Sequence, residues 1–283
     1  MTAGGAGEAP GIAGVVLRVA EAGLALSFPR LVDFPEYPAI TLRGLLGHAL
    51  LDRWKRGTGN ERLFRDFFKP QDPLPAPFML DCRPGAGRGH VLTARLRFFG
   101  SGAGAFTDFA EALAEWSRYG FGASRTQYGV FTEPPVEMEN LPWRTGWRGS
   151  GSTAWRVEFV SPTQLFRGGS SLSDPGFIPL ALAEGAARRL ERLASAYGEA
   201  AGGLVAAARR DTAGAGVLRY SLEKVDLRRV SGIDGHEVAA GGLTGWVELR
   251  GAPELERWLA AGGILGVGKK IAAGNGRIRV ERV

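Results

Sequence analysis

The sequence predicts an α+β fold made of two similar halves. With 283 residues, the chain is long enough for two ordinary domains or one large domain. A predicted helix at 106–119 leads into the glycine-rich motif GFGASRTQYGVF at 120–131, which ends in a strand. A predicted helix at 253–261 leads into a second motif, GGILGVGKKIAAGNGRIRV at 262–280, which also ends in a strand. The repeat indicates an internal duplication, so we expect two tandem ferredoxin-like (RRM-like) domains.

The hydrophobic pattern divides the first half into elements. Residues 1–11 are small, lack periodicity and are expected to form a flexible tail. The N-terminal domain is expected at 12–133, with strands at 12–19, 23–28 and 91–99 and helices at 41–56, 61–68 and 106–119. Thr41 is the expected N-cap of the first helix. Pro29 is expected in the irregular loop that precedes this helix.

The second half is predicted to begin after a region rich in proline, glycine and tryptophan. This region, 134–153, is expected to link the two domains. The C-terminal domain is expected at 154–283, with strands at 154–160, 217–230, 243–249 and 277–280 and helices at 177–197 and 253–261. Both halves therefore carry strands and helices in ferredoxin-like order.

Composition limits the possible partners and compartments. Lys and Arg number 35 and Asp and Glu 29, so the net charge is +6 and the pI about 9.8, which favours an anionic partner. A single cysteine, Cys82, excludes an intrachain disulfide and a multi-cysteine zinc site. No apolar run is long enough to span a bilayer, and the first residues lack a signal-peptide pattern. We therefore expect a cytoplasmic protein with no membrane partner.

The C-terminal glycine-rich motif is a candidate anion-binding loop. Glycines accept positive φ angles, and successive backbone N–H groups in such a loop can surround an anion. Lys269, Lys270 and Arg277 place cations beside it. The alternative is a solvated turn that joins a helix to the last strand.

His48 is the candidate proton-transfer residue. The first helix has a buried stripe formed by Leu42, Leu45, Leu46, Ala49 and Leu50. At about 100° per residue, His48 lies roughly 140° from the centre of this stripe, and Lys55 lies on nearly the same side. Gly44 leaves room there. His48 is therefore either a solvated surface histidine or a general acid or base above an open face.

The sequence contains none of the common cofactor or metal motifs. No His, Asp and Glu cluster has metal-ligand spacing, and no P-loop, dinucleotide fingerprint or Gly-x-Ser-x-Gly elbow is present. His90 and His236, the other two histidines, are expected in surface loops. We expect neither a metal nor a cofactor.

Several segments resemble one family. The motif at 262–280 resembles the glycine-rich loop of the RAMP (repeat-associated mysterious protein) superfamily of CRISPR systems, although Asn275 replaces a residue that is usually hydrophobic. Segments 157–163, 242–247 and 42–50, and the helix with Arg188-Arg189-Leu190, resemble the precursor-crRNA-processing endoribonucleases of this superfamily.

The resemblance implies an activity and its residues. Such enzymes cleave CRISPR repeat RNA (pre-crRNA) without a metal, by attack of a ribose 2′-hydroxyl on the adjacent phosphate, which leaves a 2′,3′-cyclic phosphate and a 5′-hydroxyl. Archaeal members use a tyrosine, a histidine and a lysine near the first helix. By position His48 matches the histidine, and Tyr37 and Lys55 are the suggested counterparts, although their spacing differs. The residues expected to contact RNA are Gly266, Gly268, Lys269, Lys270, Gly274, Gly276, Arg277 and Arg125.

The resemblance also allows a second function. Some RAMP proteins lack catalysis and bind crRNA within an effector complex, beside other CRISPR subunits. An accessible His48 with Lys55 or Tyr37 nearby would favour the endoribonuclease. A buried or isolated His48 would favour the binding subunit. In both cases the expected partner is CRISPR repeat RNA or crRNA.

Overall fold

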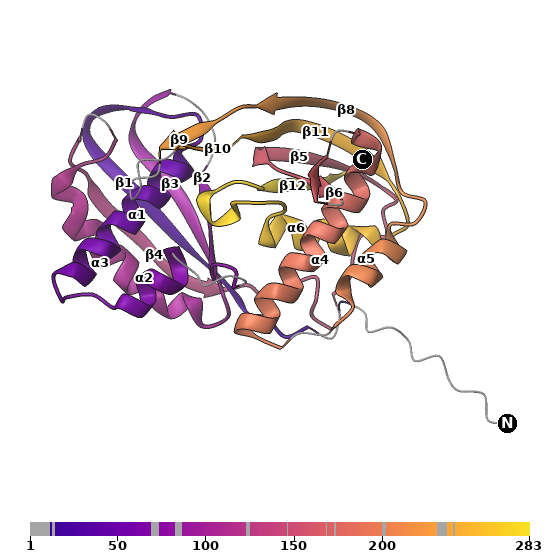
Figure 1. Ribbon diagram of the computed structural model, residues 1–283, viewed down its shortest axis with the longest axis horizontal. Coiled ribbons are helices and arrows are strands. Elements are labelled where there is room, and N and C mark those ends of the chain that lie inside the picture. Colours follow the sequence, from indigo (N-terminus) through magenta and orange to yellow (C-terminus); the bar gives the residue numbers. More distant parts are fainter. Residues whose placement is uncertain are drawn as a thin grey trace.

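The computed structural model describes most of the chain. Its described residues are 12, 15–68, 74–82, 87–122, 125–145, 147–167, 169–172, 174–199, 202–230, 237–239 and 241–283. The predicted tail at 1–11 and His236 lie outside the described residues. Two domains lie side by side, the N-terminal one in indigo and magenta and the C-terminal one in salmon to yellow (Figure 1).

The N-terminal domain is a four-stranded antiparallel sheet with helices between its strands. Its elements are β1 (Val19–Phe34), α1 (Pro38–Lys55), α2 (Glu61–Phe68), β2 (Phe78–Cys82), β3 (Gly87–Phe99), α3 (Phe106–Trp116) and β4 (Gly129–Glu137). Short 3₁₀ turns, η2 (Gly100–Ala105) and η3 (Ser117–Tyr119), flank α3. The strand order is β2-β3-β1-β4.

The C-terminal domain repeats this plan. Its elements are β5 (Ala154–Thr163), β6 (Phe166–Arg167), β7 (Ser170–Ser171), η4 (Pro175–Phe177), α4 (Ile178–Tyr197), α5 (Leu204–Asp211), β8 (Gly216–Val225), β9 (Arg228–Val230), β10 (Glu237–Ala239), β11 (Gly242–Arg250), α6 (Leu255–Leu265), η5 (Ile271–Ala273) and β12 (Ile278–Arg282). Its main sheet has the order β12-β5-β11-β8. In both domains the first strand lies between the third and the fourth. The predicted tandem ferredoxin-like fold is confirmed.

Four details of the first domain differ from the sequence prediction. Residues 15–18 of the strand expected at 12–19 precede β1, which begins only at Val19, and β2 was not predicted. β1 is one strand from Val19 to Phe34. Its register with β3 shifts between Ser27 and Val32, and Pro29 lies inside this irregularity, so the strand continues past the proline. A proline without an N–H is tolerated at such a break in the ladder. α1 begins at Pro38 with Tyr37 as N-cap and no side-chain cap, so Thr41 is not the cap. Proline at the first helical turn is favoured by its fixed φ.

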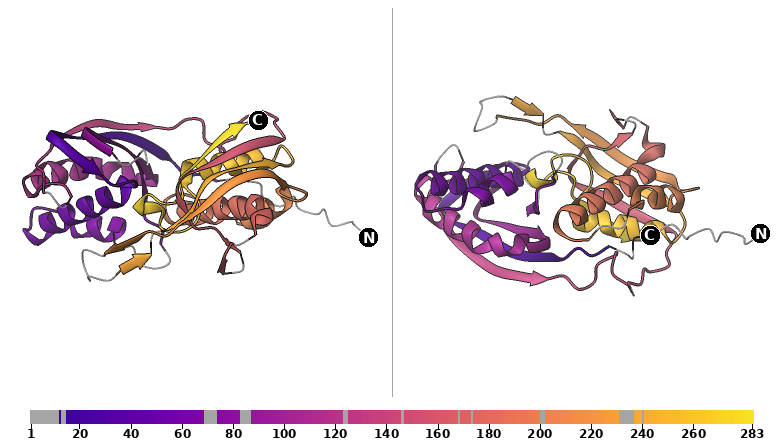
Figure 2. Two further views of the ribbon diagram at one scale, coloured as in Figure 1. Left: turned by 90° about the horizontal axis from the view of Figure 1, so that it is seen from above. Right: turned by 60° about the horizontal axis from the view of Figure 1, so that its bottom comes forward.

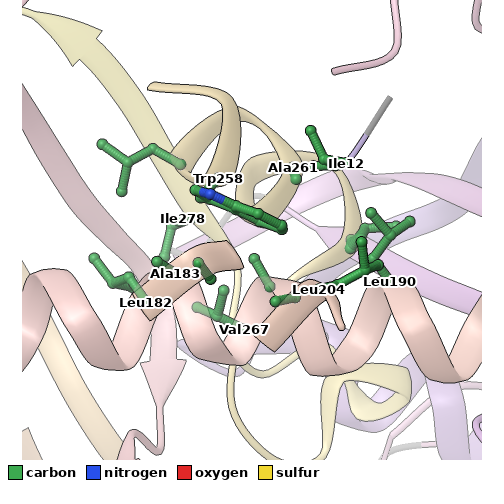
Figure 3. Packing of buried hydrophobic residues seen from close by; sticks show 14 of the residues in the cluster. Ile12, Leu182, Ala183, Leu190, Leu204, Trp258, Ala261, Val267 and Ile278 are labelled. Carbon is green, nitrogen blue, oxygen red and sulfur yellow. The ribbon is translucent and has the colours of Figure 1, made fainter. Parts of the chain in front are cut away.

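Each domain has its own hydrophobic core. The N-terminal core gathers aromatic rings, among them Phe67, whose centroid lies 5.0 Å from that of Phe109 in a T-shaped pair. The C-terminal core surrounds Trp258, whose indole N–H donates to Asp211 Oδ2 at 2.9 Å. Figure 3 shows Trp258 among core residues from α4, α6 and the glycine-rich loop, including Ala183 and Val267. Apolar burial on this scale is the main stabilising contribution to each domain.

The segments around the predicted linker contribute to the second core. β4 ends at Glu137, and Leu141 and Trp143 are fully buried in the C-terminal core together with Leu17, which precedes β1. The indole N–H of Trp143 donates to the carbonyl of Leu17 at 3.1 Å. The chain before β1 and the chain after β4 are thereby packed together onto the second domain.

The C-terminal glycine-rich loop lies between the domains. Both views of Figure 2 show η5, in yellow, at this junction. η5 contacts β2 and α1, and Asn275 beside it is almost fully buried. Gly274 has a φ of 89°, and a Cβ there would overlap the Cβ of Ala39 at the start of α1. The loop therefore fits against the first domain only without a side chain at this position.

Replacing Gly274 by alanine tests this fit. The left-handed conformation costs alanine about 1–2 kcal/mol, and the overlap with Ala39 adds to that cost. We expect the free energy of unfolding to fall by more than about 1 kcal/mol, measured by denaturant titration. Gly104→Ala is the control, since a Cβ there would meet nothing within 4 Å, and its effect should stay within about 0.5 kcal/mol. Equal stability of the Gly274→Ala variant and the wild type would contradict the fit.

Candidate functional site

His48 lies on α1 beside the end of α3. Its side chain is half-buried, and its ring stacks on that of Trp116 with centroids 6.2 Å apart and planes 14° from parallel. The ring of Trp116 also contacts the ring of Tyr119 in η3, with their centroids 4.4 Å apart. The histidine is therefore neither a core residue nor a freely rotating surface side chain, because an aromatic neighbour orients its ring.

A cavity of about 490 Å³ opens at this histidine. Its lining combines one face of α1 with the end of α3 and the loop that follows: Thr41, Gly44, Leu45, His48, Trp116, Tyr119, Gly120, Gly122 and Arg125. A Cβ at Gly44 would meet nothing within 4 Å, so the missing side chain leaves this face open. The cavity thus brings an imidazole, a phenol and a guanidinium together.

The loop after α3 places Arg125 by its backbone conformation. Gly120 and Gly122 have positive φ angles of 79° and 67°, and a Cβ at Gly120 would overlap the backbone of Arg125. The loop is closed by paired backbone hydrogen bonds between Phe121 and Thr126, at 2.8 and 3.2 Å. Arg125 itself has a φ of 46°, a conformation that non-glycine residues adopt only when their surroundings fix it.

Tyr37 and Lys55 are not among the residues that line this cavity. Tyr37 is the N-cap of α1, eleven residues before His48, which corresponds to about 16 Å along a helix. Burial, a hydrogen bond with Glu36 and the charge of Glu223 raise the pKa of Tyr37 to about 12. Lys55 is exposed at the end of α1, about 10 Å of helix beyond His48. The structure therefore puts Tyr119 and Arg125 beside His48, and the roles of Tyr37 and Lys55 stay predictions.

The predicted glycines of the C-terminal loop all adopt positive φ angles. The values are 77° for Gly266, 89° for Gly268, 89° for Gly274 and 74° for Gly276. Gly268 and Lys269 are exposed, whereas Gly274 and Gly276 are buried at the junction of the domains. The ammonium of Lys269 lies 4.1 Å from the ring centroid of Phe166. Lys270 is half-buried with a φ of 60°. Among the loop residues from Gly266 to Arg277 whose burial the structure describes, Gly268 and Lys269 are the exposed ones.

Arg277 connects the two domains. Its guanidinium forms an ion pair with Asp81 on β2. Burial raises the pKa of Asp81 and lowers the pKa of Arg277, each against the effect of its partner. Arg97 on β3 adds a second link, since Nη1 donates to the carbonyls of Gly263 and Ile264 at the end of α6, at 2.8 and 3.2 Å. Cations are favourable at helix C-termini.

Arg277 also borders a cleft between the domains. The cleft measures about 650 Å³ and is lined by Arg95, Arg97, Arg277, Arg279 and the exposed Phe131, among others. Sequence analysis did not single out Arg95 and Arg97. Their alternation on β3, which puts both side chains on one face of the sheet, is the signal that could have identified them.

A further basic cavity, also of about 490 Å³, lies between α4 and the exposed part of the C-terminal loop. Glu184 on α4 is buried there and accepts hydrogen bonds from Arg209, at 2.6 Å, and from Arg188. Burial alone would raise the pKa of Glu184, but these two hydrogen bonds outweigh it and lower the pKa.

Neither a metal cluster nor a membrane span is found in the described part of the chain. Within the ranges given above, no group of three or more His, Cys, Asp or Glu side chains could hold a metal ion. No helix among these residues is long and apolar enough to cross a membrane.

Two family models match parts of the chain. Residues 157–278 match the family model of the CRISPR-associated endoribonuclease Cas6. The resemblance to CRISPR-associated RAMP endoribonucleases is confirmed. That family is described as one of endoribonucleases. A second family model, described as an N-terminal domain, matches residues 17–133. No curated protein matches the sequence.

Solved Cas6 structures share the fold. A Cas6 product complex superposes with a TM-score of 0.63 at 19% identity, covering 93% of this chain and 99% of that chain. Thermus thermophilus Cas6 gives 0.60 at 19% identity, with 95% and 100% covered. A partial Cas6-RT-Cas1–Cas2 complex gives 0.60 at 12% identity, covering 96% of this chain and 47% of that chain. At these identities the likeness establishes the two-domain fold.

The Glu184 ion pairs make stability depend on pH. Because the pKa of Glu184 is lower in the folded protein than in the unfolded chain, its carboxylate stabilises the fold above about pH 4.3. This contribution is lost as the pH falls through the folded value. We expect Glu184→Gln to have a lower melting temperature than the wild type at neutral pH. On acidification to about pH 3, the melting temperature of the variant should fall by less than that of the wild type. Glu281→Gln, at an exposed position, is the control. If the melting temperatures of Glu184→Gln and the wild type fall equally with pH, the stabilising role of the Glu184 carboxylate is contradicted.

Proposed function

We propose that this protein is an endoribonuclease that cleaves CRISPR repeat RNA to crRNA without a metal ion. The observation that carries the proposal is the cavity that both His48, stacked on the ring of Trp116, and Arg125 line. The match of the C-terminal domain to an endoribonuclease family supports the substrate class. A structure of similar fold is a Cas6 product complex.

The reaction requires a proton acceptor, a proton donor and a cation. The ribose 2′-oxygen loses its proton and forms a bond to the adjacent phosphorus, and the bond from phosphorus to the 5′-oxygen breaks. The leaving oxygen takes a proton, which gives a 2′,3′-cyclic phosphate and a 5′-hydroxyl. The imidazole of His48 transfers one of these protons, a role that typically accelerates a reaction about 10²–10⁴-fold.

Arg125 supplies the cation in this proposal. A guanidinium remains charged in proteins and presents several N–H donors in a plane, which suits the equatorial oxygens of a pentacoordinate phosphorus. The strained backbone at Arg125 keeps it at the cavity. Tyr119 lines the same cavity, and its hydroxyl accepts a hydrogen bond from Arg118 Nη2 at 3.2 Å. Trp116 is a positioning residue, because it contacts the imidazole ring.

The C-terminal loop binds the RNA away from the scissile phosphate. Gly268 and Lys269 are its exposed members, so they are the ones that contact phosphates directly. Gly274, Gly276 and Arg277 hold the loop against the first domain and contribute to RNA binding by fixing its conformation. Lys270 lies between these two parts of the loop, and Gly266 precedes both of them.

A second candidate function is a non-catalytic RAMP subunit that binds crRNA in an effector complex with other CRISPR proteins. One observation favours it: Tyr37 and Lys55, the residues expected to act with His48, do not line the cavity of His48. Such a protein would bind repeat RNA and leave it uncut.

His48→Ala distinguishes the two functions. We expect single-turnover cleavage of labelled repeat RNA in EDTA to fall by at least about 100-fold, because a proton-transfer group is lost. The affinity for the RNA, measured by titration in parallel, should change little, because the imidazole acts in the transition state. A variant that cuts at the wild-type rate would refute the role of His48. A wild-type protein that binds the repeat and never cuts it would establish the binding subunit.

Arg125→Ala compared with Lys55→Ala tests which cation acts. Arg125 lines the cavity and Lys55 does not, so the arginine variant should lose about 10²-fold or more in single-turnover rate and the lysine variant less than tenfold. Both changes remove one positive charge, so general electrostatics affect them alike. A larger loss in Lys55→Ala would restore the assignment made from the family resemblance.

A further inference from the structure

Arg53 places a charge at the end of the apolar stripe of α1. It follows Leu46 and Ala49 by seven and four residues, so it lies on the same face of the helix, and its side chain is only 11% exposed. Its Nε is buried and has no hydrogen-bond partner among the described residues. A buried polar group without a partner costs free energy. Packing alone would therefore favour an apolar residue at this position.

The guanidinium of Arg53 faces two carboxylates of α3. Its Nη1 donates to Glu111 Oε2 at 3.0 Å and lies 3.7 Å from Glu115 Oε1. Residues four apart on a helix are neighbours, so one guanidinium reaches both glutamates. Arg56 of α1 adds a further bond, since its Nη2 donates to Glu115 Oε2 at 2.7 Å. Two arginines and two glutamates thus join α1 to α3, which lies beside it (Figure 1).

Glu115 lies where its own helix disfavours a negative charge. The C-terminal end of a helix carries partial negative charge, and α3 has no basic residue in its last turn. The carboxylate of Glu115 is therefore compensated by the arginines of α1 and by no residue of that turn. This arrangement is explained by the pairing of α1 with α3, because it gives α3 alone no stability.

The last turn of α3 is not held by the hydrophobic core. The buried residues of α3 end at Leu113, Ala114 and Glu115 are exposed, and Trp116 is half-buried. Apolar burial is non-directional, whereas hydrogen bonds between charged groups are short and specific in geometry. Because Trp116 directly follows Glu115, the bonds that fix Glu115 against α1 also fix the ring on which His48 stacks.

We propose that Arg53 is a positioning residue that sets the orientation of the His48 imidazole through Glu115 and Trp116. Arg53 is not among the residues that line the cavity of His48, and it lies five residues after the histidine, about 8 Å along α1. The inference rests on the proposed function for the reaction that this orientation serves. The orientation itself can be measured in the free protein, without RNA.

The first measurement is the proton resonance of the His48 imidazole ring. The chain has three histidines, so this signal is identified by its loss in His48→Ala. The ring current of Trp116 shifts the signal, because the two rings are stacked. Arg53→Met removes the guanidinium and keeps an apolar stem, so the fold should be retained. We expect the His48 resonance of Arg53→Met to move toward its position in Trp116→Ala. Spectra over a full pH titration separate stacking from ionisation.

The second measurement is the single-turnover cleavage of repeat RNA. A misplacement of about 1 Å can cost about 10²-fold in rate, so we expect Arg53→Met to be slower by about tenfold or more. Its affinity for the RNA should change little, because the imidazole acts in the transition state. Arg53→Lys keeps the charge without the planar fork, so its rate should lie between those of Arg53→Met and the wild type.

Free imidazole tests whether Arg53 acts through His48. Imidazole added to His48→Ala is not attached to α1 and can follow the ring of Trp116. His48→Ala and His48→Ala/Arg53→Met should therefore cleave at the same rate at the same imidazole concentration. A loss in this background as large as in the protein that retains His48 would overturn the proposed route.

Two further variants separate positioning from general effects. Glu111→Gln/Glu115→Gln removes the same ion pairs from the side of α3, where both side chains are partly exposed, and should move the His48 resonance as Arg53→Met does. This variant decides the question if melting temperatures show that Arg53→Met is not folded. Arg65→Met on α2 is the control. It also removes one arginine and one ion pair, with Glu61 of the same helix, and should leave both measurements unchanged.

The combined outcomes separate this role from the proposed function. A moved resonance with a lowered rate supports it. An unmoved resonance in both Arg53→Met and Glu111→Gln/Glu115→Gln refutes it, while cleavage by the wild type still supports the endoribonuclease. A moved resonance with a wild-type protein that never cuts supports the orientation of His48 by Arg53 and refutes the endoribonuclease. A moved resonance with an unchanged rate in an active enzyme overturns the role of Arg53 in the reaction.

Discussion

Two glycines with positive φ angles follow the last helix of each domain, and both cavities depend on them. At Gly120 and at Gly266 the chain leaves the helix in a conformation that costs other residues about 1–2 kcal/mol, and it turns back toward the first helix of its own domain. The space between that loop and helix is the cavity. In the second domain the same loop continues into the junction, where Gly274 contacts Ala39 and Arg277 binds Asp81. One backbone constraint thus shapes the two sites and joins the domains.

The duplicated sites differ in the chemistry of one helix position. The first cavity has the imidazole of His48 at this position, and the second has the guanidinium of Arg188. The surroundings have diverged in the same direction. The first cavity is lined by Trp116, whose ring stacks on the imidazole, and by Tyr119, whose ring contacts Trp116. The second is lined by further arginines.

Much of the fold could be predicted from the sequence because it depends on local patterns. The repeated helix and glycine motif predicts the duplication, and the apolar stripe of α1 predicts that His48 lies off the core face. The length of β1 was missed, because the register shift that accommodates Pro29 depends on pairing with β3. The residues that line the cavity beside His48 were not predicted as a set. A helical projection shows the direction of side chains about the axis of α1, but Trp116, Tyr119 and Arg125 come from α3, η3 and the loop after them and line the same cavity only in the folded protein. The partner of Arg277, Asp81, lies in the other domain and has no local signal.

The role of His48 is tested most directly by chemical rescue. His48→Ala enlarges a cavity of about 490 Å³, which leaves room for free imidazole beside Trp116 and Arg125. We expect the variant to be inactive in EDTA and to regain cleavage of repeat RNA at the same bond as imidazole is added, with a rate that rises with imidazole concentration. Cleavage by His48→Ala at the wild-type rate without imidazole would contradict the assignment of proton transfer to this residue.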